Sequence, residues 1–283
     1  WWQHIHRCDF ASALEALAAK ADVELRKLSE TERQHIHAAR SEQTTRRAIL
    51  RIAAEHYHNQ LLASPAALDY SHGRGWTDET ITSQMIGYVP TPADKPLLSL
   101  GEIQPLATQL RSANLLDHPL AKAVLSIPQG HIVYAHRHDG IVTYLTGRSI
   151  TVRRHYKLPA DLADGQQFYH AQPAKSRRGV RILVEGQAGA ISHAQYGFDA
   201  VALCGLATGE ARIEEISHVA FDNDSAGLAK ALDAALALGP MTKVVTWPNQ
   251  AKHREPGQGY KEIKDANDLL GGGFDSEAIA TLL

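Results

Sequence analysis

Three carboxylates of this sequence, Glu185, Asp222 and Asp224, stand where two expected strands end. Glu185 directly follows the apolar run 180–184, and the two aspartates follow the apolar run 218–221. Ligand sites in open α/β sheets lie at the carboxyl ends of strands, so the three acids should converge. Packed carboxylates repel one another unless a cation neutralises them, and all-oxygen ligand sets favour Mg²⁺ or Mn²⁺ over Zn²⁺. The spacing therefore predicts a metal site suited to phosphoryl transfer.

Further residues are expected to support this site. Asp222 and Asp224 should act together, because residues two apart in an extended segment point to the same side. An acidic cluster with Asp265 and Asp268 follows the last expected strand and could add ligands. Gly186 would allow a tight turn from the first strand into the next helix. An Asp-x-Asp pair alone is most often a loop or a helix cap, but its combination with an acid at the end of another strand is far more specific.

The elements that must position these acids lie from residue 180 onward. Strands are expected at 180–184, 200–203, 218–221 and 243–247, and the clearest helix at 226–238. Short apolar strands separated by helices indicate a mostly parallel sheet that is covered on both faces.

The part before residue 180 has a different pattern. A helix is expected at 10–21, with Asp9 as its N-cap, and another from about residue 44 to 62. β-branched and aromatic runs on both sides of Asp139-Gly140 predict a hairpin. Residues 165–179 are polar and are interpreted as a connecting segment. The expected fold class is α/β, with an α+β N-terminal part followed by a βαβ domain that has a parallel sheet.

Charge is distributed unevenly along these 283 residues. The net charge is −2, but residues 147–181 carry eight basic and two acidic side chains, whereas residues 182–283 carry fourteen acids and seven bases. A basic stretch before an acidic one suggests a surface for phosphates beside a site for cations. Ordinary solvated surface charge is the alternative interpretation.

The length of the chain is typical of two or three compact units.

Several classes of protein are excluded by composition. No apolar run is long enough to cross a bilayer, and no phosphate-binding loop of an ATPase or helicase is present. The two cysteines, Cys8 and Cys204, provide no disulfide framework, which fits a cytoplasmic location. The alternate spacing of His4, His6 and Cys8 matches no closed zinc site, so we expect no zinc in this sequence. It begins at Trp1 rather than Met, and we expect it to be a piece of a longer protein.

Several segments resemble the motifs of DnaG-type primases. Val184-Glu185-Gly186 resembles the first motif of their TOPRIM domain, the segment 221–227 is similar to the second, and the segment 264–269 resembles the third acidic segment. Residues 73–88 are similar to the Arg-Gly…Ile…Gly-Tyr segment of the primase catalytic core. Gly147-Arg148 and Tyr156-Lys157 resemble its basic motifs. The helix expected at 10–21 is similar to the one that follows the family's zinc ribbon. The resemblance covers nearly the whole chain, in the same order.

The resemblance implies a DNA primase catalytic core that makes short RNA primers on single-stranded DNA from NTPs, with Mg²⁺ or Mn²⁺. It implies a helical segment or linker at 1–43 after an upstream zinc-ribbon domain, a basic subdomain at 44–178 and a TOPRIM domain at 179–283. The implied partners are the template, NTPs and a replicative helicase, which is either separate or fused beyond Leu283. No membrane partner is expected.

The resemblance also implies roles for individual residues. Glu185, Asp222 and Asp224 would be catalytic and metal-binding, and Asp265 and Asp268 would be additional metal ligands. Nucleotide and template binding falls to basic side chains, which suit phosphate oxygens: Arg74, Arg148, Arg153, Arg154 and Lys157. Tyr156 could stack on a base or pack in the core.

One position departs from the family pattern. Primases usually have an Asp four residues after the first glutamate, and this chain has Gly189 there. With fewer oxygen ligands, one metal site should bind its cation more weakly, or Asp265 or Asp268 should serve as the ligand instead. Two alternatives stay open, namely a TOPRIM nuclease and a catalytically weakened TOPRIM module that binds DNA. Gly189 favours the second alternative, and the upstream basic segments favour a primase.

Overall fold

The computed structural model describes residues 2–26, 28–94, 106–165, 167–173, 179–206, 215–248, 250–252 and 260–283. It contains two compact units, Trp1–Thr44 and Thr45–Leu283. Three members of the basic stretch lie outside the described residues: Lys175, Arg177 and Arg178. No helix in the described part of the chain is long and apolar enough to span a bilayer.

The first unit is helical. It contains α1 (Trp2–His6), α2 (Phe10–Lys20) and the beginning of α3 (Glu30–Leu62). The Asp9 side chain accepts a hydrogen bond from the Ser12 amide at 2.8 Å, which confirms the expected N-cap of α2. The sequence placed the start of the next helix near residue 44, and this was wrong. Ser29 and Glu32 form a reciprocal capping box that begins α3 one residue after Ser29.

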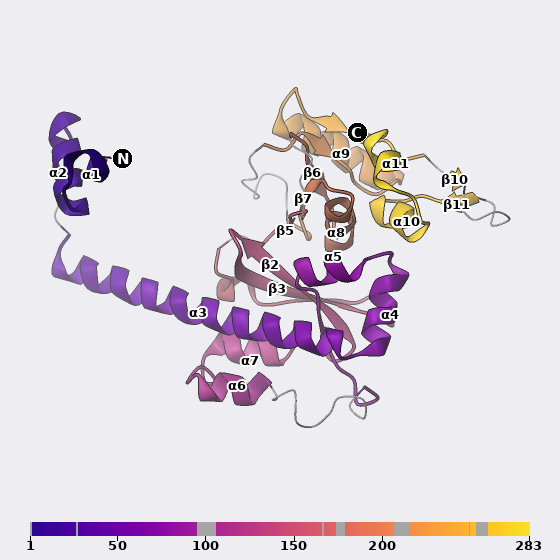
Figure 1. Ribbon diagram of the computed structural model, residues 1–283, viewed down its shortest axis with the longest axis horizontal. Coiled ribbons are helices and arrows are strands. Elements are labelled where there is room, and N and C mark those ends of the chain that lie inside the picture. Colours follow the sequence, from indigo (N-terminus) through magenta and orange to yellow (C-terminus); the bar gives the residue numbers. More distant parts are fainter. Residues whose placement is uncertain are drawn as a thin grey trace. The chain divides into compact units, whose positions relative to one another are not determined.

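The second unit begins with a helical layer and an antiparallel sheet (Figure 1). Its helices are the rest of α3, then α4 (Pro65–Gly73), α5 (Asp78–Ser83), α6 (Leu106–Ser112) and α7 (Pro119–Leu125). The sheet has the order β1 (Gly87–Val89), β2 (His131–His138), β3 (Ile141–Ser149), β4 (His155–Lys157). Asp139 and Gly140 both have positive φ in the turn between β2 and β3, which confirms the predicted hairpin.

The second sheet contains the strands expected from the later part of the sequence. Its order is β5 (Tyr169–Ala171), β7 (Asp199–Ala202), β6 (Arg181–Val184), β8 (His218–Val219), β9 (Lys243–Val244). The strands β6, β7, β8 and β9 pair in parallel, as predicted. β5 pairs antiparallel with β7 in a region interpreted from sequence as a connection. β5 has only three residues, two of which are buried. A pattern this short does not distinguish a strand from a loop in the sequence.

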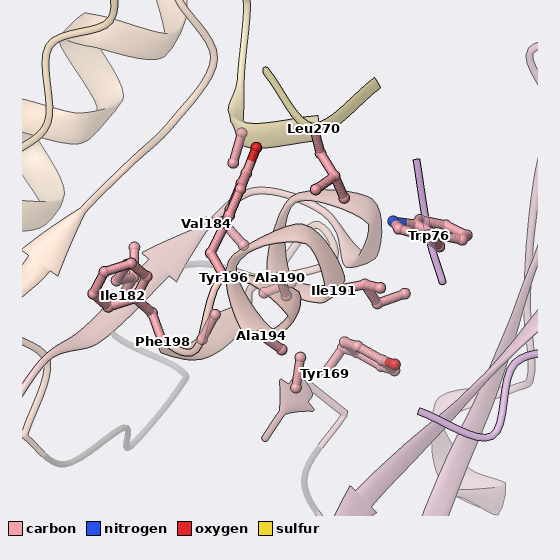
Figure 2. Close-up of a cluster of buried hydrophobic side chains, with 14 of the residues drawn as sticks. Trp76, Tyr169, Ile182, Val184, Ala190, Ile191, Ala194, Tyr196, Phe198 and Leu270 are labelled. Atoms are coloured by element: carbon pink, nitrogen blue, oxygen red, sulfur yellow. The ribbon is translucent and has the colours of Figure 1, made fainter. Parts of the chain in front are cut away.

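Helices cover both faces of the second sheet. Leu183, Val219 and Phe221 pack against α9 (Ser225–Leu238), whereas Ile182 and Val184 face α8 (Gln187–Gln195). This alternation along β6 gives each face its own apolar layer. Figure 2 shows side chains of α8, such as Ile191, between Val184 of β6 and Trp76. The remaining described elements are a 3₁₀ turn (Ala160–Leu162), β10 (Gln250–Lys252), β11 (Tyr260–Glu262), α10 (Ala266–Gly271) and α11 (Ser276–Ala280).

The segment Arg74-Gly75-Trp76 attaches the helical layer to α8 and α10. Arg74 Nη1 donates to Asn267 Oδ1 at 2.7 Å, and Asn267 Nδ2 donates back to the Arg74 carbonyl at 3.0 Å. Trp76 is only 1% exposed and lies beside Leu270 and Ile191 in the core. Gly75 has a φ of +82°, and a Cβ there would lie 2.9 Å from the Leu270 carbonyl. The close approach therefore requires glycine.

We predict that Gly75→Ala destabilises the protein by at least about 2 kcal/mol, because it adds left-handed strain to a backbone clash. Gly73→Ala is the matched control, since a Cβ at Gly73 has no atom within 4 Å. It lies at the end of α4 and should be neutral or slightly stabilising. Urea unfolding of both variants measures the difference. Equal stability of the two variants would contradict the described attachment.

Candidate active site

The ends of β6 and β8 bring two of the predicted acids to one cavity. Glu185 directly follows β6, and Asp222 lies three residues beyond β8. Asp265, the N-cap of α10, lines the same cavity, whose volume is about 450 Å³. The convergence expected at the carboxyl edge of the sheet is therefore present for Glu185, Asp222 and Asp265.

Asn223 holds the second and third acidic segments together. Its amide donates to the Lys264 carbonyl at 2.7 Å, and its side chain donates to the Ile263 carbonyl at 2.9 Å. These bonds fix Asp222 beside Asp265, although the two are far apart in sequence. Asn223 could not be assigned a role from the sequence, because its partners are backbone carbonyls of a distant loop.

Asp224 and Asp268 are engaged as helix caps in this structure. Asp224 Oδ1 accepts from the Gly227 amide at 2.7 Å at the start of α9, and Asp268 Oδ2 accepts from the Lys264 amide at 3.0 Å. Neither residue lines the cavity of Glu185 and Asp222. The expected extended geometry of Asp222 and Asp224 is wrong, because the Asp224 amide donates to the Asp222 carbonyl at 2.9 Å and turns the chain at Asn223.

The glycines around the site differ in importance. A Cβ at Gly227 would lie 2.2 Å from the Asp222 carbonyl oxygen, so the first turn of α9 can approach this loop only as glycine. Gly186 was expected to allow a tight turn into the next helix, and only Glu185 and Gly186 separate β6 from α8. Gly186 does not need the conformational freedom of glycine there. Its φ is −132°, and a Cβ there would have no atom within 4 Å.

The acids repel one another across the cavity. The pKa of Asp222 is raised to about 6, first by partial loss of hydration and then by the charges of Asp265, Glu185, Asp224 and Asp268. Burial also raises the pKa of Asp265. Glu185 forms an ion pair with Lys230 of α9, whose Nζ lies 3.6 Å from Glu185 Oε2. Lys230 was not singled out from the sequence, because a lysine on an exposed helix face gives no signal of a distant carboxylate.

The donor chemistry fits a divalent cation held by oxygen atoms. Three carboxylates share one cavity, and their repulsion makes a positive charge favourable there. Within the described residues, however, no three His, Cys, Asp or Glu side chains are already grouped closely enough to hold an ion. Cation binding therefore requires side-chain movement of Glu185, Asp222 or Asp265 toward a common point.

The opposite wall of the cavity is basic and comes from the first sheet. Arg148 of β3 and His155, Tyr156 and Lys157 of β4 line it. Lys157 Nζ donates to the Cys204 carbonyl, and the Tyr156 hydroxyl contacts Ser126 and the Ala123 carbonyl. The structure thus lines one cavity with basic groups from the first sheet and with acids from the second sheet and α10.

The remaining predicted basic residues lie elsewhere. Arg153 and Arg154 are exposed in the turn between β3 and β4 and do not line the cavity. Arg74 is held between Tyr70 and Asn267, with its guanidinium carbon 5.6 Å from the Trp76 ring centre. Through Asn267 it positions α10, whose N-cap is Asp265.

We predict that Asp222→Asn stabilises the cation-free protein at pH 7 by on the order of 1 kcal/mol, a value reduced for solvent screening. The folded-state pKa lies above the ordinary value of 3.8, so the ionised carboxylate costs stability above about pH 6. The stability difference between the variant and the wild type should shrink as the pH falls from 6 towards 4, because Asp222 of the folded wild-type protein then takes up a proton. Thermal unfolding across this pH range measures it.

Mg²⁺ should raise the melting temperature of the wild-type protein and have little effect on Asp222→Asn. Asp117→Asn serves as the control, since this exposed carboxylate is outside the cavity. An Asp222→Asn variant that is less stable than the wild type at pH 7 without cation would contradict the described repulsion.

We predict that Gly227→Ala lowers stability by about 2 kcal/mol or more and removes Mg²⁺ stabilisation, because the methyl group must displace the Asp222 backbone. Gly186→Ala adds the same methyl group beside the same cavity, where there is room for it. It should keep wild-type stability. Thermal unfolding with and without Mg²⁺ compares the two variants, and a normal Mg²⁺ response in Gly227→Ala would show that the Asp222 loop tolerates displacement.

Curated proteins similar to this chain include two DNA primases. The one from Geobacillus stearothermophilus is 30% identical over 260 residues, which are 85% of this chain and 44% of that protein. The one from Deinococcus radiodurans is 31% identical over 249 residues, which are 81% of this chain and 41% of that protein. The chain therefore spans less than half the length of these relatives. No family model matches the sequence.

Solved structures of primases share the fold. The zinc-binding and RNA polymerase domains of the Aquifex aeolicus primase align with a TM-score of 0.63 at 19% identity, over 99% of this chain and 68% of that chain. A DnaG primase catalytic domain bound to single-stranded DNA aligns with a TM-score of 0.53 at 20% identity, over 86% of this chain and 81% of that chain. At these identities the likeness establishes the fold.

Proposed function

We propose that this chain, which is related in sequence and fold to the DnaG-type DNA primases, is a catalytic core that makes short RNA primers on single-stranded DNA. The observation that carries the proposal is the cavity with Glu185, Asp222 and Asp265 on one side and Arg148 and Lys157 on the other. Primer synthesis needs both halves, because nucleotidyl transfer requires cation ligands beside groups that bind phosphates.

In the proposed mechanism the 3′-hydroxyl of the growing primer attacks the α-phosphate of an NTP, the bond from the α-phosphorus to the oxygen that bridges it to the β-phosphate breaks, and pyrophosphate leaves. A divalent ion held by Asp222, Asp265 and Glu185 would neutralise charge on the attacking and leaving oxygens. Glu185 is either a ligand or the base that accepts the hydroxyl proton. Asp224 and Asp268 would join as further ligands from the loops beside Asp222 and Asp265.

The basic residues bind the nucleic acid and the nucleotide. Arg148 and Lys157 hold NTP phosphates or the template backbone inside the cavity, since guanidinium and ammonium groups suit phosphate oxygens. Arg153 and Arg154 contact the template from the exposed turn. Arg74 acts on the site through α10. DNA binding should therefore weaken steeply with salt, and Arg153→Ala with Arg154→Ala should reduce the salt dependence.

We also propose the division of the chain into a segment at 1–43, a basic subdomain at 44–178 and a TOPRIM domain at 179–283. The compact unit that ends at Thr44 supports the first boundary. The second boundary, between residues 178 and 179, lies after β5. The basic subdomain therefore contributes β5 to the sheet of the TOPRIM domain, where it pairs with β7. A replicative helicase remains the proposed protein partner.

A weakened module that binds DNA is the second candidate function. It is favoured by Gly189, which supplies no carboxylate beside the cavity, and by the lack of a pre-assembled ion site among the described residues. This candidate predicts DNA binding with little dependence on Mg²⁺ and no primer synthesis.

Primer synthesis can be tested with a single-stranded template, labelled NTPs and Mg²⁺ or Mn²⁺. We expect labelled primers from the wild-type protein and at least about a 100-fold loss in Asp222→Asn and Glu185→Gln, because each removes a cation ligand. Asp117→Asn should keep full activity. Cleavage of the template without NTPs would support a nuclease instead. Primer synthesis that survives in both site variants would refute the assignment of these residues.

Gly189→Asp should strengthen Mg²⁺ binding by about tenfold or raise primer yield, because a Cβ at this position meets only Val184 at 3.7 Å and a carboxylate has room beside the cavity. Calorimetric Mg²⁺ titration measures the change. Ala188→Asp, one residue earlier on α8, tests whether any added charge nearby has the same effect. An unchanged affinity in Gly189→Asp would mean that another group already fills this role.

A further inference from the structure

The cavity of the acidic residues extends to a fully buried histidine. His193 of α8 lines it together with Asp222 and Asp265, yet His193 is 0% exposed whereas Asp222 is open to solvent. A carboxylate that is open to solvent and a histidine that is buried in the core therefore line the same cavity of about 450 Å³. His193 could not be singled out from the sequence, because sixteen histidines are scattered along the chain.

Neither ring nitrogen of His193 has a hydrogen-bond partner among the described residues. Burial lowers its pKa to about 3, and the ring is therefore neutral, with one N–H donor and one nitrogen acceptor. Leaving such groups unpaired in the core destabilises the folded protein. A fully buried polar ring that touches a polar cavity is thus expected to have a partner inside that cavity.

Two polar neighbours of His193, Trp247 and His218, are already engaged. The Trp247 ring lies 6.1 Å away, and its Nε1 donates to the Phe221 carbonyl at 2.8 Å. His218 contacts Ser217 Oγ at 2.9 Å and the Leu283 carbonyl at 3.0 Å through its two nitrogens. The cavity is therefore the side from which a partner can reach His193.

Gly189 opens the route between the acids and His193. The two residues are four apart on α8, so they lie on one face of the helix with about 6 Å of rise between them. Both line the cavity, and glycine contributes no side chain between the carboxylates and the imidazole. A separation of one helical turn suits a bridging water molecule better than direct coordination, in keeping with the absence of a pre-assembled ion site in the described residues.

We propose that His193 is a positioning residue of the cation site, hydrogen-bonded through the space beside Gly189 to a water molecule of the cation that Asp222 and Asp265 hold. The imidazole thus takes over part of the role that a carboxylate at position 189 would have. The inference rests on the proposed function only in assuming that the cavity takes up a divalent cation. Groups that orient metal-bound ligands in this way typically contribute 10–100-fold to metal affinity.

Calorimetric Mg²⁺ titration of four variants tests the proposal without measuring primer synthesis. We expect His193→Leu to bind Mg²⁺ about tenfold more weakly than the wild type while remaining folded, since it removes two unpaired polar atoms from the core. In Gly189→Asp, the added carboxylate should make Mg²⁺ affinity insensitive to His193→Leu. The double variant should therefore bind Mg²⁺ as tightly as Gly189→Asp alone.

His56→Leu is the matched control. His56 is also buried, with an unpaired Nδ1, but it lies on α3 and does not line the cavity. Its replacement should leave Mg²⁺ affinity unchanged. If His193→Leu behaves like His56→Leu, His193 is an ordinary core residue and the proposal is wrong.

A measurement on the wild-type protein covers the case in which His193→Leu does not fold. The ring ¹⁵N resonances of His193, assigned through its backbone, should shift on Mg²⁺ addition, and those of His56 should not. Unmoved His193 resonances in a protein that binds Mg²⁺ through Asp222 would overturn the inference and leave the proposed function intact. A wild-type protein that takes up no divalent cation would overturn both.

Discussion

The mutual repulsion of carboxylates at the end of the second sheet is the interaction on which the other features of the site depend. Glu185 and Asp222 are placed together by parallel pairing of β6 and β8, and Asp265 is added by the bonds of Asn223. The fold thus maintains partly buried carboxylates of like charge at a cost in stability, because loss of hydration first, and the neighbouring charges second, raise the pKa of Asp222. Such a cost is explained most simply by a cation that the cavity is built to bind.

The rest of the second unit keeps this arrangement in place. Arg74, Gly75 and Trp76 attach the helical layer to α8 and α10, so that Asp265 is held from the side opposite β8. Gly227 lets α9 approach the Asp222 backbone closely. The basic wall of β3 and β4 then faces the acids across the cavity. Positions far from the acids in sequence therefore determine how closely the acids can approach one another.

Much of the fold could be predicted because its signals are local. Asp139-Gly140 determines a hairpin by turn chemistry, and the apolar runs before Glu185 and Asp222 determine parallel strands. β5 could not be predicted, because its three residues become a strand only by pairing with β7. The early start of α3 was a missed local signal, since the capping box of Ser29 and Glu32 is visible in the sequence.

The site could be predicted only in part for a similar reason. The carboxyl ends of strands identified Glu185 and Asp222, but the turn at Asn223 that makes Asp224 a helix cap depends on a distant loop. Lys230 and His193 carry no motif, and their relation to the acids arises from tertiary packing alone. Gly189 was recognised as a departure, whereas its consequence, an open path to a buried imidazole, required the structure.

Glu185, Asp222 and Asp265 are proposed to share a divalent cation. Electron paramagnetic resonance of free Mn²⁺ during titration with the protein, with Mg²⁺ as competitor, tests this sharing. We predict uptake of Mn²⁺ that Mg²⁺ reverses and that Asp222→Asn abolishes. Uptake of the same amount by Asp222→Asn, or no uptake by the wild-type protein, would contradict it.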